Sequence, residues 1–214
     1  MGQIANLDYS KLLERYPNLE TCAPHIISMV NELINCFSNE NKLMVMGNGG
    51  SSADAEHLCG ELMKGFVSKR PLTKEEKEKF DSIDPNISRN LQRSIPAISL
   101  GVGHSIISAF ANDVNAEYVY AQQVFGLAKK GDCVLGISTS GNSANIVQAL
   151  KVAKAQGAVT MALTGERDSE CSKVADVTVQ VPGKVTHIVQ ELHLPIYHAI
   201  CLEIEKYFFI SSEA

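Results

Sequence analysis

The pattern of apolar and polar positions predicts short strands that alternate with helices. A first apolar run, Leu43 to Met46, stops at a glycine turn, and four later runs are each bounded by Gly, Pro, Ser or Thr. These later runs are Ile95 to Leu100, Cys133 to Ile137, Val159 to Leu163 and Val177 to Val181. Helical stretches separate them at Ser105 to Ala111, Glu117 to Leu127 and Ala144 to Ala155. We therefore expect an α/β fold with a doubly wound, mostly parallel sheet, in which ligands bind outside the carboxyl ends of the strands.

Helices are also predicted at both ends of the chain. Apolar residues recur at helical spacing over Tyr9 to Tyr16 and Ala23 to Phe37, which predicts an N-terminal helical hairpin within residues 1–42. This hairpin either covers the sheet or a partner subunit, or it only completes the core. A long last helix is predicted from about Thr186 to Phe209, and Pro195 inside it favours a kink.

A charged segment, residues 68–94, follows the helix that begins after the glycine turn. Its charge density and its two prolines, Pro71 and Pro85, predict an excursion over the surface. Thr73 is the expected N-cap of a helix over Lys74 to Phe80. The segment is either a lid over a site or an insertion, and we favour the insertion because connections of this length are uncommon in compact domains.

Composition and charge narrow the class of protein. The 214 residues fit a single domain, and a net charge of −5 with a sequence pI near 5.7 does not indicate a nucleic-acid surface. The longest uncharged run, residues 94–112, contains Pro, His, Ser and Gly and is no membrane span. Six scattered cysteines without a C-x-x-C pair, and no signal-peptide pattern ahead of them, predict reduced thiols in a cytoplasmic protein.

The turn after the first strand is a candidate anion site. Gly47-Asn48-Gly49-Gly50 is followed by Ser51 and a helix. Three glycines in four positions permit positive φ and expose N–H groups, and the next helix adds its positive end. The spacing matches neither the Walker pattern nor G-x-G-x-x-G, so we expect a phosphate here but not a nucleotide.

Two titratable residues follow on the same helix. His57 and Glu61 are four residues apart, so their side chains share one face. An imidazole and a carboxylate in that relation can bind one metal ion or share one proton, whereas the alternative is a solvated surface pair. Their place just past the glycine turn favours the functional interpretation, because phosphate site and titratable groups would face one cleft.

A second candidate phosphate site follows the strand that ends at Ile137. Its loop reads Ser138-Thr139-Ser140-Gly141-Asn142-Ser143, and a helix begins near Ala144. Hydroxyls, an amide and exposed N–H groups would converge there at a helix N-terminus without any fixed charge. The alternative is an N-cap at Asn142 or Ser143 in a polar loop, but capping needs one such residue rather than five.

The remaining candidate site residues lie on the last helix and after the short central helix. Gln190 and His198 are eight residues apart, a rise of about 12 Å on a straight helix. His193 is the easier companion of Gln190 by spacing, and spacing alone does not choose between the two histidines. The pair Asn112-Asp113 is typical of a C-cap and turn, and it matters for function only if the fold brings it to the cleft.

Taken in order, these motifs resemble those of the sugar isomerase (SIS) family. They are G-N-G-G-S-x-x-D-A-x-H-x-x-x-E, Asn112-Asp113, S-T-S-G-N-S and Q-E-L-H-x-x-x-x-H, and within the family they are similar to the sedoheptulose 7-phosphate isomerases. The resemblance covers nearly the whole chain as one SIS domain, residues 1–214, and excludes only residues 68–94, which the usual members lack or carry in shorter form. The serine loop alone would indicate only a phosphosugar-binding domain.

The resemblance implies roles for individual residues. Glu61 and His198 match the acid/base pair, and Asn112 and Asp113 match the residues that touch the sugar hydroxyls. The implied substrate and phosphate contacts are Asn48, Gly49, Gly50, Ser51, Glu61, Asn112, Asp113, Ser138, Thr139, Ser140, Ser143 and Gln190. The implied zinc ligands are His57, Glu61, Gln190 and His198, so the resemblance selects His198 over His193. Because Gln is a rare zinc ligand, we expect one loosely held or replaceable ion per subunit.

The resemblance further implies a homotetramer with active sites at subunit interfaces. The expected reaction converts sedoheptulose 7-phosphate to glycero-manno-heptose 7-phosphate through an enediol. The alternatives are an isomerase of another sugar phosphate and a non-catalytic phosphosugar-binding SIS protein, such as the relatives that bind a replication initiator. A transcriptional regulator is not indicated, since no basic helix-turn-helix pattern precedes the first strand.

The chain departs from the family pattern at two positions. Many members carry an Arg four residues after Glu61, where this chain has Gly65 with Lys64 beside it. An acidic residue common shortly after the second strand corresponds here to Gly103, next to His104. Both departures leave the acid/base residues in place and bear on the identity of the sugar.

Overall fold

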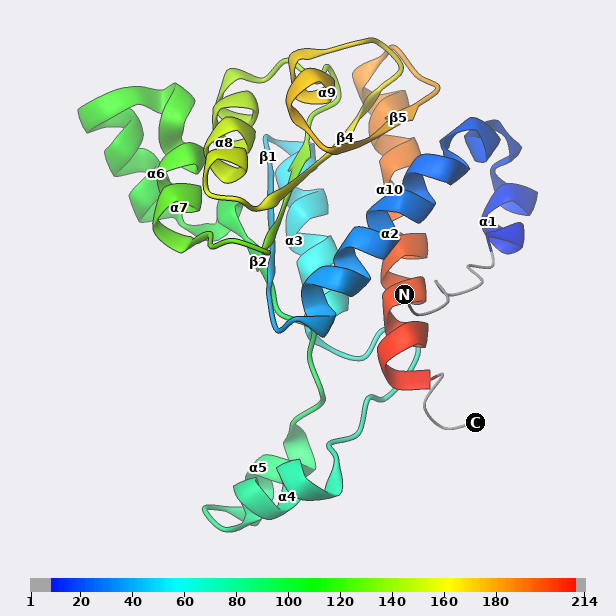
Figure 1. The fold of residues 1–214 in the computed structure, drawn as a ribbon, viewed down its shortest axis with the longest axis vertical. Helices are drawn as coiled ribbons and strands as arrows, with labels where there is room; N and C mark the ends of the chain where they lie inside the picture. Colours follow the sequence, from blue (N-terminus) through cyan, green and yellow to red (C-terminus); the bar gives the residue numbers. More distant parts are fainter. Residues whose placement is uncertain (1–8, 211–214) are drawn as a thin grey trace.

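Five parallel strands form the sheet in the computed structural model, which describes residues 9–210 (Figure 1). In spatial order they run β2-β1-β3-β4-β5. Their bounds are β1 Leu43–Gly47, β2 Ala97–Ser99, β3 Cys133–Ile137, β4 Val159–Gly165 and β5 Val177–Val181. The strand order reverses between β1 and β3, which is the switch point where doubly wound folds bind ligands. The predicted fold class is confirmed.

Helices cover both faces of this sheet (Figure 1). One face carries α2 Ala23–Ser38, α3 Gly50–Met63 and α10 Thr186–Glu205. The other face carries α7 Val119–Leu127, α8 Ala144–Ala155 and α9 Glu170–Val174, with α6 His104–Phe110 packed outside α7 and α8. The N-terminal helix α2 therefore completes the core of its own chain, which is one of the two predicted roles.

The strands are apolar throughout because both faces are buried. In β1, Val45 packs into the cluster with α2, α3 and α10, whereas Met44 and Met46 pack into the cluster with α7 and α8. Leu135 and Val134 of β3 divide in the same way. Successive side chains of a strand point to opposite faces, so a strand buried on both sides reads as a continuous apolar run.

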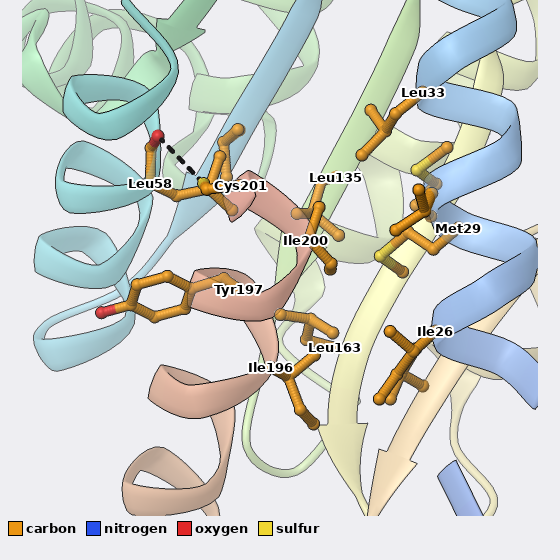
Figure 2. Packing of buried hydrophobic residues seen from close by; sticks show 14 of the residues in the cluster. Ile26, Met29, Leu33, Leu58, Leu135, Leu163, Ile196, Tyr197, Ile200 and Cys201 are labelled. Carbon is orange, nitrogen blue, oxygen red and sulfur yellow. Dashed lines mark hydrogen bonds between the residues drawn. The ribbon is translucent and has the colours of Figure 1, made fainter. Parts of the chain in front are cut away.

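The last helix runs through the middle of one layer and continues past Pro195. Figure 2 shows α10 between α3 and the strands, with Ile196 and Ile200 directed toward Leu163 and Leu135 and the ring of Tyr197 directed toward α3. The helix changes to a π-helical turn at Lys206–Ile210. The α-helix ends at Glu205, and the predicted end at Phe209 falls within the π-helical turn that continues it.

Residues 68–94 form two short helices that stand apart from the sheet (Figure 1). These are α4 Lys74–Asp81 and α5 Pro85–Asn90, and neither contains a buried residue. Thr73 caps α4 as predicted, because its hydroxyl accepts from Glu76 N at 3.2 Å while the Glu76 carboxylate accepts from Thr73 N at 2.7 Å. Figure 1 places the pair beyond the end of α3 that lies away from the carboxyl ends of the strands, so the segment does not close over the glycine and serine turns.

Local assignments differ from prediction in a few places. β2 is only three residues long, because Leu100–Val102 already forms a 3₁₀ turn. Asn112-Asp113 is not a C-cap: the chain continues from α6 into a π-helical segment, Ala111–Asn115, and the predicted turn there is wrong. The first predicted helix is present as α1 Ser10–Arg15, and three short helical elements had no clear signal: the 3₁₀ turn Pro17–Cys22, α5 and α9.

All six cysteines are buried, and none of them forms a disulfide. Within residues 9–210, no helix has the length and apolar character needed to cross a membrane. The first eight residues of the predicted N-terminal hairpin lie outside the part of the chain that the structure describes.

Candidate active site

The glycine turn and the serine loop lie side by side. β1 and β3 are parallel neighbours, with Gly47 paired to Ile137, so the loops that follow them leave the same edge of the sheet. Asn48 and Asn145 join the two loops through reciprocal side-chain hydrogen bonds of 2.9 Å. The structure thus brings both predicted phosphate motifs to one location.

The glycine turn has the conformation that its sequence predicts. Gly49 has φ +55°, which favours glycine, and α3 begins there without a side-chain cap. An added Cβ at Gly50 would lie 2.5 Å from Nε2 of Gln190, so any side chain there would displace the Gln190 amide from the turn. The hydroxyl of Tyr120 on α7 donates to Gly47 O at 2.6 Å and fixes the turn from the other face of the sheet. Tyr120 is a supporting residue that the local sequence pattern did not indicate.

The serine loop leaves its helix end open for an anion. Ser143 occupies the N-cap position of α8, but its hydroxyl lies 3.0 Å from that of Ser138 and makes no capping bond. Asn142 has a structural part instead, because its amide oxygen accepts from Glu170 N at 2.9 Å and ties the loop to α9. The alternative in which Asn142 or Ser143 merely caps α8 is therefore wrong. Because Ile146 N already donates to Asn145 Oδ1 at 3.0 Å, the N–H groups left for an anion are those of Ala144 and Asn145 in the first turn.

Helices α3 and α10 run in the same direction, so residues later in α3 contact residues later in α10. Gln190 lies against Gly50, Tyr197 reaches Asp54, and His198 meets His57. One level further on, the Cys201 thiol lies 3.9 Å from the carbonyl oxygen of Leu58, as drawn in Figure 2. The titratable groups of the two helices therefore face one another along a shared seam.

His57, Glu61 and His198 form the chemical centre of this seam. His57 Nε2 lies 3.3 Å from Glu61 Oε1 and 3.5 Å from His198 Nε2. The His57 side chain is 43% exposed and that of Glu61 is 14% exposed, so a ligand can reach the group from one side. Burial, reinforced by the neighbouring His57, lowers the pKa of His198 and favours its neutral form.

Tyr197 and Asp54 orient the imidazole of His57. The Tyr197 hydroxyl donates to Asp54 Oδ1 at 3.3 Å, so its oxygen is left to accept from His57 Nδ1 at 3.0 Å. That arrangement places the proton of neutral His57 on Nδ1 and leaves the Nε2 lone pair facing Glu61 and His198. Burial raises the pKa of Asp54 and, with the nearby Asp54 carboxylate, that of Tyr197.

Lys64 supplies a cation beside Glu61. Its Nζ donates to Glu61 Oε2 at 2.9 Å, and its side chain is 60% exposed. An added Cβ at Gly65 would collide with the carbonyl oxygen of Ser68, so no larger residue fits that position with this backbone. The backbone at the start of the charged segment therefore excludes a side chain at Gly65, where many family members carry an Arg. In this chain the positive charge near Glu61 comes from Lys64.

Some of the donor atoms of this centre are spaced as two ligands of one metal ion would be. Two ligands bound at about 2.0–2.1 Å to a tetrahedral zinc are about 3.3–3.4 Å apart, close to the two separations measured from His57 Nε2. Lone pairs that converge in this way repel unless a proton or a cation lies between them. No group of three or more His, Cys, Asp or Glu side chains within residues 9–210 meets the criteria of a complete metal site. The two separations fit a metal, whereas the residues that the structure describes do not assemble the full ligand set.

The remaining predicted residues fall into two groups. Gln190 contacts the glycine turn, two helical turns from His198, so the two do not meet in one chain. Asn112 and Asp113 are exposed on the π-helical segment, and the only side-chain partner of Asn112 within the described chain is Asp113, at 2.8 Å. Ser51 is buried in the first turn of α3, and Thr139 and Ser140 lie in the serine loop.

The histidine that spacing favoured lies elsewhere. His193 is completely buried, and its Nε2 donates to Thr164 O at 3.3 Å. Burial lowers its pKa to about 4, so it is neutral in the native protein at neutral pH. His193 therefore belongs to the core, and His198 is the histidine of α10 that meets His57.

Comparisons with known proteins agree with this geometry. Residues 105–201 match the SIS domain family. The chain is 39% identical over 186 residues to a phosphoheptose isomerase of Pelobacter propionicus, with 87% of each chain covered. It is 36% identical over 202 residues to a phosphoheptose isomerase of Nitratiruptor, with 94% of this chain and 95% of the relative covered.

Solved structures give the same result. The fold is similar to a phosphoheptose isomerase of Neisseria gonorrhoeae, with a TM-score of 0.72, 27% identity, and coverage of 92% of this chain and 96% of the other. A phosphoheptose isomerase of Francisella tularensis matches with a TM-score of 0.72, 26% identity, and coverage of 92% and 93%.

Proposed function

The chain belongs to the phosphoheptose isomerases of the SIS family, and from this premise we propose that it converts sedoheptulose 7-phosphate to glycero-manno-heptose 7-phosphate. The convergence of His57, Glu61 and His198 on two parallel helices supports the proposal, because one of those helices begins at the phosphate turn. Helix α3 therefore connects the proposed phosphate site to the proposed acid/base residues.

The phosphate is held by neutral donors. Hydroxyls of Ser138, Ser140 and Ser143, the turn at Asn48 to Gly50, and the open N-termini of α3 and α8 surround the common edge of β1 and β3. From Gly50 to His57 the helix rises about two turns, or about 11 Å, which is comparable to the length of an extended seven-carbon sugar phosphate. The substrate therefore extends along α3 from its phosphate to its carbonyl end.

Glu61 and His198 move the protons. The Glu61 carboxylate removes a proton from C1 of the ketose and returns it to C2, while His198 transfers a proton between the oxygens on C2 and C1. An enediol is the intermediate, and Lys64, 2.9 Å from Glu61, contributes positive charge where negative charge develops. Tyr197 and Asp54 hold the imidazole of His57 in one tautomer beside both groups.

We propose that the site also takes one zinc ion per subunit. His57, Glu61 and His198 would hold it, with Gln190 as the fourth ligand that the family resemblance implies. A bound zinc would supply Lewis-acid polarisation of the substrate's two oxygens. Because Gln190 lies at the glycine turn and no complete set forms in the described chain, we expect weak, exchangeable binding.

A homotetramer in the cytoplasm is part of the same proposal. Apolar side chains stay exposed along α6, the π-helical segment and α7, including Val114 at 67% and Phe125 at 66%. Burying such a surface against further copies would also bring Asn112 and Asp113 to another subunit's site. The six buried, unpaired thiols support a reducing compartment.

The direct test is incubation with sedoheptulose 7-phosphate, followed by NMR of the sugar with and without a chelator. New anomeric signals from the aldose are expected, and their rate of appearance should fall with chelator and recover with added zinc. Full conversion at an unchanged rate in chelator would remove the zinc proposal. No new sugar signal under either condition would remove the proposed substrate.

A further inference from the structure

A cavity lies at the base of the charged segment and is separated from the proposed catalytic centre by Lys64, which lines it and pairs with Glu61. It has a volume of about 780 Å³ and is lined by the end of α3 together with Lys69, Pro71, Leu72, Lys77 and residues 88–92. Volumes of this size are typical of sites for cofactors and other small molecules. The glycine turn and the serine loop contribute no lining residue.

The lining carries one sign of charge. Lys64, Lys69, Lys77 and Arg89 face the cavity, and no Asp or Glu is among its lining residues. Lys69, Lys77 and Arg89 form no ion pair with any residue that the structure describes, although the chain as a whole has a net charge of −5. Three unpaired cations beside the Glu61-paired Lys64 attract an anion and repel one another while it is absent. The charge pattern indicates a ligand with more than one negative charge.

The rest of the lining is apolar or neutral. Met63 and Leu91 line the cavity and remain 53% and 46% exposed, and Pro71 and Leu72 add apolar surface. Ser88, Asn90 and Gln92 supply neutral hydrogen-bonding groups. A sugar would leave the apolar surface unused, whereas a flat base would cover it and offer polar edges to the amides.

We propose that this cavity is a nucleotide site, in which the cations bind a diphosphate and the apolar side chains contact the base. The proposal does not depend on the isomerase assignment, because no residue that binds the sugar phosphate lines the cavity. Lys64 is the only side chain common to the cavity and the catalytic centre, where it pairs with Glu61.

The test is calorimetric titration of the full chain, in its own assembly, with ADP, inorganic pyrophosphate and adenosine. ADP should bind once per chain and more tightly than pyrophosphate or adenosine, and its affinity should fall with added salt. The double variant Lys77→Gln/Arg89→Gln should weaken ADP binding by about tenfold or more, because it removes two charge-assisted contacts. The matched control is Lys74→Gln/Lys79→Gln, which removes two charges from the same helical segment outside the cavity and should bind like the wild type.

A further variant separates the two anion sites. Ser138→Ala/Ser143→Ala alters the serine loop and should leave ADP binding unchanged. The proposal is overturned if ADP does not bind at millimolar concentration, if pyrophosphate binds as tightly as ADP, or if the serine-loop variant loses ADP binding while the Lys77/Arg89 variant retains it. Isomerase activity enters none of these readouts, so failure here is distinguishable from failure of the proposed function.

Discussion

At the scale of single residues, His193 and His198 of α10 show how the environment of a histidine decides its role. His193 and His198 are five positions apart, which places them about 140° apart around the helix axis. His193 points into the core and donates to a strand carbonyl, whereas His198 points along the seam with α3 and meets His57. The same helix therefore carries one histidine in the core and another in the proposed catalytic centre.

Replacing the proposed base should separate chemistry from binding. In Glu61→Gln the amide cannot accept the C1 proton, so we expect turnover to fall by about 10²- to 10⁴-fold. The fold and the phosphate contacts should be retained, because Glu61 contacts neither loop. The measurement is the NMR assay of sugar conversion, with phosphate affinity and thermal unfolding measured on the same samples.

The matched control for this variant is Glu56→Gln, an exposed glutamate on the same helix, which should turn over like the wild type. Near-normal conversion by Glu61→Gln would show that another group is the base.

The buried His193 should make the protein less stable in mild acid. Its native pKa of about 4 lies below the ordinary value of 6.5, so between these pH values the unfolded chain takes up a proton that the native state excludes. The free energy of unfolding should fall by about 3 kcal/mol as pH drops from 6.5 to 4, and this contribution should be constant above pH 6.5. Urea unfolding across that pH range measures the slope.

His193→Gln removes the titration and keeps an N–H donor for Thr164 O, so its stability should depend less on pH than that of the wild type. His187→Gln, an exposed change on the same helix, should keep the wild-type slope. Identical slopes for the wild type and His193→Gln would assign the acid sensitivity to other groups.

At the scale of elements, a buried ion pair fixes the base of the charged segment to α3 and α10. Arg70 Nε lies 2.6 Å from Glu205 Oε1, and both side chains are fully buried. The guanidinium also donates to the carbonyl oxygens of Leu62 and Glu61, while the Glu205 carboxylate accepts from the N–H groups of Phe66, Val67 and Ser68. Burial alone would raise the pKa of Glu205, but these N–H groups and Arg70 outweigh it and lower that pKa.

Breaking this pair on one side should be costly. Arg70→Met leaves a buried carboxylate without its cation and two carbonyls without a donor, so we expect a loss of about 3–5 kcal/mol in the free energy of unfolding. Because Glu205 has a lowered native pKa, its contribution is present above the unfolded pKa and is lost as pH falls through the native one. The deficit of Arg70→Met should therefore shrink in acid. Urea unfolding at neutral and acidic pH is the measurement.

Lys69→Met serves as the control, since it removes a neighbouring exposed charge and should change stability by no more than about 0.5 kcal/mol. Equal stability of Arg70→Met and Lys69→Met would contradict the structural role of the pair.

Element patterns were readable from the sequence because each strand is buried on both faces and each helix repeats its apolar positions locally. Thr73 and the two loop motifs were also predictable, since caps and glycine turns depend on residues a few positions apart. Contacts across the fold were not. Nothing local shows that Tyr197 meets His57 and Asp54, or that Arg70 meets Glu205. The π-helical segment at Asn112-Asp113 also has no local signal that separates it from a turn.

At the scale of the whole molecule, one chain holds only part of the proposed site. The glycine turn and the His57 centre share α3, but Asn112 and Asp113 stand exposed on the layer of the opposite sheet face, beside the exposed apolar side chains of α7. A partner subunit that covers this surface would bury the apolar side chains and also contact Asp113. The assembly is thus predicted to be a requirement for turnover and not only for stability.

Mixing two inactive variants tests this requirement directly. Glu61→Gln removes the proposed base and Asp113→Ala removes a sugar contact, so each homo-oligomer should convert little substrate. If Asp113 acts in a neighbouring subunit, co-expressed mixed oligomers contain some sites with an intact Glu61 from one chain and an intact Asp113 from another. Activity of the purified mixture should then clearly exceed that of either variant, and light scattering should report a tetramer.

Phe125→Glu supplies the physical control, because a buried charge at the subunit contact should dissociate the tetramer and abolish both activity and complementation. Ile83→Glu, an exposed apolar position between α4 and α5, should leave the assembly intact. If the mixture is no more active than its components while the tetramer persists, then Asp113 serves its own chain. In that case the seam between α3 and α10 would have to be completed by movement within one subunit.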